Sequence, residues 1–386
     1  MGTFDDTIVN PAKLENSLRE AVCQQCHLQG QQRVLHRGRE MSEFRPGLPF
    51  DMFACEFVAG SRTGAGKFVG SVEQMYASQC FQKGTGAKKM GCISCHDPHS
   101  VPTAEKKVEF YRGRCMTCHQ EKGCSVPVET RLDAKKQDNC IACHMPPTGT
   151  NLNHASVNDH RILRRPDTTA KPDPTALAER DLVPFHQSNV VSKLIVDRDF
   201  GIALVRQSNR LPTPEARPLA EKAQKLLDSA LATDASDVPA RESLGSALWF
   251  LGRLEAAFDA YERVLASEPK RETTLHLIAQ LSQRLGRPGA ARSYAERVLA
   301  VNPMRWEYHQ TLARACMELK DWRTALKESQ EVVTLHGTEW MSHQTIVLCH
   351  MRLGDKARAS KAFETLLGLN PPKPEELRKW FAQISR

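Results

Sequence analysis

The amino-acid sequence predicts a mainly α-helical protein built from two different parts. In the C-terminal half, alanine recurs at a constant spacing of 34 residues, at Ala223, Ala257, Ala291, Ala325 and Ala359. In the N-terminal part the pattern C-x-x-C-H occurs four times, between segments rich in glycine, lysine and turn residues. We therefore expect short helices and loops over residues 1–165, a proline-rich linker over residues 166–189 and an α-solenoid over residues 190–386.

The first C-x-x-C-H pattern, CQQCH, is expected at the end of a helix over residues 11–27. Pro11 suits the first turn of a helix, and Leu14, Leu18 and Val22 recur on one helical face. The other three patterns lie between residues 92 and 144, where apolar runs are too short to form a core. The first 165 residues as a whole are poor in long apolar runs, so we expect them to have little aliphatic core and to stay unfolded until another apolar group completes them.

Each C-x-x-C-H pattern is the attachment signature of c-type haem, in which two cysteines bond the porphyrin and the histidine ligates the iron. One helical turn brings both cysteines to one face, next to the histidine. The alternative is structural zinc, because paired C-x-x-C motifs also fit four-cysteine sites. Histidine is only 14 of 386 residues, so its presence after all four pairs favours haem. We expect four covalent haems on Cys23, Cys26, Cys92, Cys95, Cys115, Cys118, Cys140 and Cys143, with His27, His96, His119 and His144 as proximal ligands.

Four further histidines of the N-terminal part are candidates for the sixth ligands of the irons. These are His36, His99, His154 and His160. His99 follows His96 too closely to bind the same iron from the opposite side, so it would bind a neighbouring haem. His36 is the weakest candidate, because VLHRGRE is also typical of a basic surface turn, and Met41, Met52 or Met75 would replace it. Ligation by two histidines would give low-potential electron carriers.

Three cysteines of the N-terminal part lie outside the motifs, at Cys55, Cys80 and Cys124. They are expected either as free buried thiols or in a disulfide, for which Cys80 with Cys124 is the favoured pair. Haem attachment takes place outside the cytoplasm, where disulfides persist. Cys316 and Cys349 are expected as ordinary core residues of the helical part.

Composition and the start of the chain bear on location and partners. No run of 18 apolar residues occurs, so no membrane span is expected. The start, MGTFDDTIVNPAKLENS, lacks the apolar segment of a signal peptide, so we expect the true beginning upstream and a periplasmic or otherwise extracytoplasmic protein. The formal charge of +8 is offset by haem propionates and gives no support to nucleic-acid binding.

Glycine and proline share the 34-residue period of the C-terminal half. Glycine recurs at Gly252, Gly286 and Gly354, with Lys320 at the fourth position, and proline recurs at Pro269, Pro303 and Pro371, with Gly337 in the gap. This pattern resembles the tetratricopeptide repeat, a helical hairpin with a small residue at the turn. We expect four repeats from about residue 238 to 371, a divergent one over 190–235 and a capping helix from Pro374 to Ile384. Such solenoids present a concave face to a partner.

The runs VEQMYASQCFQKGTGAKKMGCISCHDPHSVP, CMTCH, GCSVP, CIACHMPP and NDHRI resemble the multihaem cytochromes of the doubled-CXXCH type, related to the tetrahaem cytochrome c of nitrifying bacteria. Bacterial proteins join such a domain to tetratricopeptide repeats. The resemblance implies haem at the four motifs, His99 and His160 as distal ligands, and an extracytoplasmic location. Members often carry a further haem motif and a signal sequence before the segment that corresponds to CQQCH.

These features predict an electron carrier rather than a catalyst. A redox partner protein is expected to dock on the repeat domain or at a haem edge, and the oligomeric state is not indicated. The alternative is a haem-dependent reductase or oxidase of a small nitrogen or sulfur compound, with an open site at the first haem. That alternative predicts that His36 is uncoordinated. It also predicts a basic pocket near the first haem, formed by Arg33, Arg37 and Arg39.

Overall fold

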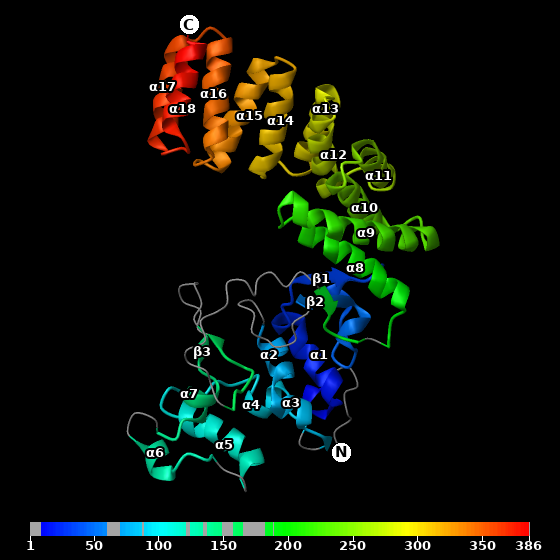
Figure 1. The fold of residues 1–386 in the computed structure, drawn as a ribbon, viewed down its shortest axis with the longest axis vertical. Coiled ribbons are helices and arrows are strands. Elements are labelled where there is room, and N and C mark those ends of the chain that lie inside the picture. The colour runs from blue at the N-terminus through cyan, green and yellow to red at the C-terminus, as the bar shows by residue number, and fades with distance from the viewer. Residues whose placement is uncertain are drawn as a thin grey trace, which may run out of the picture. The chain divides into compact units, whose positions relative to one another are not determined.

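The structure, a computed structural model, describes residues 9–59, 70–86, 89–120, 124–133, 137–148, 157–164, 182–187 and 189–385. It is mainly helical and divides into two compact units, Met1–Gln207 and Ser208–Arg386 (Figure 1). Among the described residues, no helix is both long and apolar enough to cross a membrane. The predicted fold class is confirmed.

The C-terminal unit consists of helical hairpins that pack on one another in chain order (Figure 1). Four hairpins fall where the 34-residue period predicts them, and the capping helix has the predicted bounds. The helices are α9 (Thr213–Thr233), α10 (Val238–Phe250), α11 (Leu254–Ser267), α12 (Glu272–Arg284), α13 (Pro288–Val301), α14 (Trp306–Glu318), α15 (Trp322–Leu335), α16 (Trp340–Arg352), α17 (Lys356–Gly368) and α18 (Pro374–Ile384).

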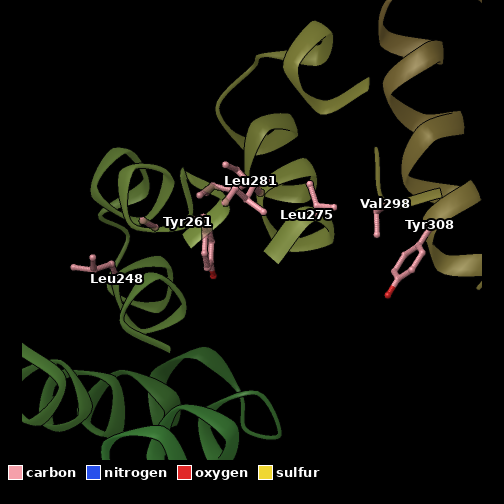
Figure 2. Packing of buried hydrophobic residues seen from close by; sticks show 9 residues of the cluster. Leu248, Tyr261, Leu275, Leu281, Val298 and Tyr308 are labelled. Atoms are coloured by element: carbon pink, nitrogen blue, oxygen red, sulfur yellow. The ribbon is translucent and has the colours of Figure 1, made fainter. Parts of the chain in front are cut away.

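Small residues set the close helix crossings of this unit. All five periodic alanines are fully buried. Gly245 on α10 lies against Tyr261 on α11, and a Cβ at Gly245 would come within 2.6 Å of the tyrosine ring. Figure 2 shows how the core continues from Leu248 and Tyr261 to Val298 and Tyr308 across successive helices. Cys316 and Cys349 are buried in the next part of this core, as expected.

The turn inside each hairpin needs a left-handed backbone. Gly252, Gly286 and Gly354 have φ angles of 78°, 67° and 82°, and Lys320 adopts the same conformation with φ 61°. This is the usual way to end a helix, and it favours glycine because any Cβ is strained there. The lysine therefore keeps the turn geometry at an energetic cost.

The N-terminal unit contains a three-stranded antiparallel sheet with β2 (Ala54–Ala59) between β1 (Gln32–Leu35) and β5 (Leu182–Pro184). A cluster of buried phenylalanines joins this sheet to the helices α1 (Asn16–His27) and α2 (Ser71–Ala77). Short 3-10 helices lie in the connections, at η1 (Pro11–Lys13), η2 (Met41–Glu43) and η3 (Phe50–Met52). Part of the N-terminal unit therefore has its own apolar core, so the expectation of little apolar core over residues 1–165 is wrong for this part.

Helix α8 (Lys193–Ser208) packs on this sheet. Phe200 stacks on Phe57 of β2 with ring centroids 5.4 Å apart. The sequence suggested a linker over 166–189 and a divergent repeat from residue 190, whereas the compact units divide after Gln207. Contacts between residues far apart in the chain, which no local pattern reveals, place β5 and α8 with the first unit.

The remaining elements of the N-terminal unit are short. They are α3 (Gln79–Lys83), α4 (Cys92–Cys95), α5 (Lys107–His119), α6 (Val128–Leu132), α7 (Cys140–His144) and a two-stranded sheet of β3 (Pro147–Thr148) and β4 (Val157–Asn158). Short helices with loops between them are what the sequence predicts for this segment.

Candidate functional site

Each of the four C-x-x-C-H motifs lies at the C-terminal end of a helix. The motif histidine is the last residue of α1, α5 and α7, and it directly follows α4. Within one helical turn the two cysteines are three positions apart and share a face with the histidine. The prediction that helices carry the motifs is therefore confirmed.

A buried carboxylate joins the first two motifs. Glu20 on α1 is 1% exposed and accepts hydrogen bonds from the Cys92 main-chain N–H at 3.1 Å and from the Cys92 thiol at 2.9 Å. The Cys92 thiol is also hydrogen-bonded to Cys23, and this bond lowers the pKa of the Cys23 thiol. The same bond, together with burial, raises the pKa of Cys92. Cysteines of two motifs that lie 69 positions apart in the sequence therefore meet.

A second carboxylate joins the last two motifs. Asp138, two residues before α7, binds Arg112 of α5 and Arg131 of α6, each at 2.5 Å. The hydrogen bond from Arg112 is the main cause that lowers the pKa of Asp138. Beside this ion pair, burial raises the pKa of the Cys115 thiol to about 12, and Cys140 is hydrogen-bonded to it. The third and fourth motifs therefore also lie side by side.

His96 and His160 lie next to each other. Their ring centroids are 6.3 Å apart and their planes differ by 25°. His160 is held from two sides, because its main-chain N–H donates to Gln74 Oε1 at 2.8 Å and its ring Nδ1 donates to the Asn158 carbonyl at 2.7 Å. Burial is the main cause that lowers the pKa of His96, and His160 and His27 add to the effect. The lowered pKa favours the neutral imidazole of His96, the form that binds metals.

His144 is oriented in the same manner as His160. Its ring Nδ1 lies 2.8 Å from the Leu163 carbonyl oxygen, so Nδ1 donates and Nε2 is the remaining nitrogen. Metal-binding histidines usually donate their second ring N–H to a carbonyl in this way, which fixes the tautomer and the ring plane.

Four predicted ligands are exposed as whole residues, namely His27, His96, His99 and His119. The main-chain N–H of His99 donates to Asp97 Oδ1 at 2.9 Å, which fixes the loop that carries it. His154 lies outside the described residues. Exposed imidazoles are accessible to a large group placed over them.

His36 lies in a different environment from the one predicted. It is buried, its Nδ1 is 2.5 Å from Asp199 Oδ2 and its Nε2 is 3.0 Å from the Asp51 carbonyl oxygen. Both ring nitrogens are therefore engaged within the protein, which leaves none for an iron. The partner Asp199 comes 163 residues later in the chain, so the sequence around His36 does not reveal it.

The other residues considered beside the first motif also have partners in the protein. Arg33 binds Glu56 at 2.6 Å and donates to the Gln25 carbonyl at 3.0 Å, which caps the end of α1. Arg39 lies over the ring of Phe53 at 5.7 Å. Of the methionines proposed in place of His36, Met75 is buried, and Met41 and Met52 pack against the phenylalanine cluster.

No disulfide forms in the structure. All thirteen cysteines lie in described residues and are free thiols, so the favoured pair of Cys80 with Cys124 is not formed. Cys80 instead lies close enough to Cys118 for that thiol to help raise its pKa, although burial is the larger cause. Within the described ranges, no three His, Cys, Asp or Glu side chains come together as a metal-binding group.

The segment that carries the last three motifs lacks an apolar interior of its own. Among its described residues, from 76 to 164, no hydrophobic side chain is fully buried. Several are strongly exposed instead, with Val101 at 88%, Leu132 at 59% and Val128 at 55%. A chain folded around large apolar groups would show this pattern, so the residues present fit bound haem.

Comparison with known proteins bears on the second unit. The family model for the tetratricopeptide repeat matches residues 220–272 and 276–334. The helical hairpins are tetratricopeptide repeats. No curated protein matches the chain.

Solved structures of MamA resemble part of the chain. One, a crystal structure of MamA protein, is 14% identical with a TM-score of 0.41 and covers 46% of this chain and 91% of its own. Another, of MamA AMB-1, is 20% identical with a TM-score of 0.42 and covers 48% of this chain and 96% of its own.

The tetratricopeptide repeats continue beyond the matched residues. Hairpin α16–α17 has two helices of 13 residues, against 13 and 14 in the earlier hairpins, and its turn at Gly354 has the left-handed backbone seen at Gly252 and Gly286. One polar contact even recurs at the repeat spacing, because His309 Nε2 donates to the Pro303 carbonyl at 2.9 Å and His343 Nε2 to the Gly337 carbonyl at 3.0 Å. These histidines therefore hydrogen-bond to the turns between repeats and serve as packing groups. A domain of this kind serves protein–protein interaction.

Proposed function

We propose that the protein is a tetrahaem c-type cytochrome that carries electrons and uses its tetratricopeptide repeats to bind a partner protein. The four C-x-x-C-H motifs would each hold one haem through two cysteines and a histidine. When bound, haem supplies one-electron chemistry at its iron. The protein's part is to hold the irons, to set their ligands and to keep them close together.

The observation that carries this proposal is the pair of His96 and His160. A metal–imidazole nitrogen bond is about 2 Å long, so each ring centroid would lie about 3.1 Å from an iron and two opposed rings about 6.2 Å from each other. The two rings are 6.3 Å apart and nearly parallel. The separation supports His160 as the sixth ligand for the haem of the second motif, and coordination would turn the Nε2 edges of both rings toward the iron.

The supporting residues hold this geometry. Asn158 and Gln74 fix the ring and main chain of His160, and Leu163 fixes His144. Glu20 and Asp138 hold the motifs in two adjacent pairs. Short separations between haems are what electron transfer along a chain of irons requires.

The test is to express the chain behind an export leader, together with a c-type cytochrome maturation system. The proposal expects an intact mass with four covalent haems and reversible reduction of all four. A protein of unmodified mass, or one that takes up stoichiometric zinc at the cysteine pairs, would refute it. Because haem attachment takes place outside the cytoplasm, the proposal also includes a periplasmic or otherwise extracytoplasmic location.

A second candidate function rests on the engagement of His36. With both ring nitrogens bound to Asp199 and Asp51, this residue does not supply a sixth ligand to the first haem. An open iron there would allow a haem-dependent reductase or oxidase of a small nitrogen or sulfur compound. A high-spin ferric signal that shifts when cyanide or nitrite is added would favour this candidate. A wholly low-spin spectrum would eliminate it.

A further inference from the structure

Two buried carboxylates from distant parts of the chain meet directly after the first motif. Glu73 of α2 accepts the main-chain N–H of Gly30 at 2.7 Å and that of Gln29 at 3.2 Å. Glu56 of β2 reaches Gly30 from the other side, so closely that a Cβ on this residue would collide with Glu56 Oε1. Gly30 has a φ of 38°, which also favours glycine.

Each carboxylate keeps one oxygen without a hydrogen-bond partner. Within the described part of the chain, Glu56 Oε1 and Glu73 Oε2 are buried and unpaired, and so is the amide oxygen Oε1 of Gln31. Glu56 is 1% exposed and Glu73 is 7% exposed. A buried carboxylate oxygen without a partner costs several kcal/mol unless a proton or a cation satisfies it.

Among the described residues, one positive charge is paired with these two carboxylates. Arg33 Nε binds Glu56 Oε2 at 2.6 Å, which offsets one carboxylate. Burial is the main cause that raises the pKa of Glu56, and Glu73 adds to it. Two negative charges are therefore disfavoured here unless a proton or a cation is bound beside the unpaired oxygens.

The three unpaired groups of Glu56, Glu73 and Gln31 are oxygens, and a main-chain carbonyl lies near one of them. A Cβ at Gly70 would lie 2.6 Å from Glu73 Oε2 and 3.1 Å from the His27 carbonyl oxygen, so these two oxygens face the same point. Arg33 pairs with Glu56 across β1 and β2. Gln31, two residues before Arg33, therefore lies diagonally opposite Glu56 on the same face. Carboxylate, amide and carbonyl oxygens without nitrogen or sulfur are the ligand set of hard cations.

We propose that Glu56 and Glu73, together with Gln31 Oε1 and the His27 carbonyl, bind a calcium ion. Calcium fits better than magnesium because it accepts irregular oxygen sets, whereas magnesium requires nearly octahedral geometry. The ion would fasten β2 and α2 to the end of α1, directly after the CQQCH motif. The proposal stands independently of whether haem is bound.

The test uses the full chain as purified, freed of metals with a chelator. Titration with calcium chloride is expected to show one site per chain, and magnesium chloride is expected to bind at least tenfold more weakly. Glu73→Gln and Glu56→Gln, which keep the side-chain size, should each raise the calcium dissociation constant at least tenfold. Glu364→Gln, an exposed glutamate on α17, is the matched control and should leave it unchanged.

Other outcomes overturn the proposal. If the wild-type chain binds no calcium and Glu73→Gln raises the thermal midpoint, the two carboxylates share a proton instead. If calcium binds equally to all variants, the ion sits elsewhere. Should a glutamate variant fail to fold, Gln31→Ala removes only a neutral oxygen and should still weaken calcium binding severalfold. An unchanged affinity in that variant counts against the site.

Discussion

Lys320 provides a direct test of how the repeat turns are built. It is the one position of the periodic turn series that lacks glycine, and it still adopts φ 61°. Its main-chain N–H donates to the Met317 carbonyl at 3.0 Å, so the turn is formed in the same way as at Gly286, whose N–H donates to the Gln283 carbonyl at 3.0 Å. Replacing Lys320 by glycine should therefore relieve strain without changing the fold.

The size of the effect follows from two opposing contributions. A left-handed backbone costs an L-residue about 1–2 kcal/mol relative to glycine. Glycine loses more conformational freedom on folding, and this lowers the gain in stability by about 0.4–1 kcal/mol. Lys320→Gly should then raise the free energy of unfolding by about 0.5–1 kcal/mol, or the thermal midpoint by about 1–4 °C for a unit of this size.

Tryptophan fluorescence measures this unit selectively, because all five tryptophans lie in it, at Trp249, Trp306, Trp322, Trp340 and Trp380. Urea unfolding of Lys320→Gly would be compared with that of Lys327→Gly. Lys327 lies on α15 with its side chain 74% exposed, so glycine there should lower stability by about 1 kcal/mol. If both substitutions destabilise the unit, the explanation by backbone strain is refuted.

Three further substitutions test other parts of the structure. His160→Ala should convert about one quarter of the iron from low-spin to high-spin in the electron paramagnetic resonance spectrum, since one haem of four would lose a ligand; an unchanged spectrum would contradict the pairing with His96. His309→Gln should destabilise the repeats more at about pH 5.5 than at about pH 8. The hydrogen bond to Glu328 raises the pKa of His309, so it stabilises the folded state only while the imidazole is protonated. Urea titrations at both pH values measure this, and an equal loss of stability at both would refute it. Gly245→Ala should cost about 1–3 kcal/mol in the same titration, because the added Cβ meets the Tyr261 ring at 2.6 Å; no loss would show that the crossing relaxes freely.

Local periodicity was sufficient to predict the repeat unit. Each hairpin buries its alanine against the helix before it, so the spacing of Ala257, Ala291, Ala325 and Ala359 specifies the packing directly. The cap from Pro374 to Ile384 follows from the same count. Even Lys320, which breaks the pattern in sequence, keeps it in conformation.

The N-terminal unit was less predictable because its contacts are long-range. Asp199 turns His36 from a candidate iron ligand into a buried partner, and Phe200 brings α8 onto the sheet. Neither partner lies within a sequence window that shows periodicity. The same applies to Glu20, which joins two motifs although nothing in its own segment marks it.

The helices that carry the motifs differ in length, and this affects the electrostatic potential at each motif. Counted along the chain, α1, α4, α5 and α7 have 12, 4, 13 and 5 residues, each ending at its motif histidine or directly before it. The carbonyl end of a helix carries a partial negative charge that grows over the first few turns. In a haem-loaded chain this charge favours ferric iron. The first and third haems would therefore be harder to reduce than the second and fourth, so that potential alternates along the chain of four.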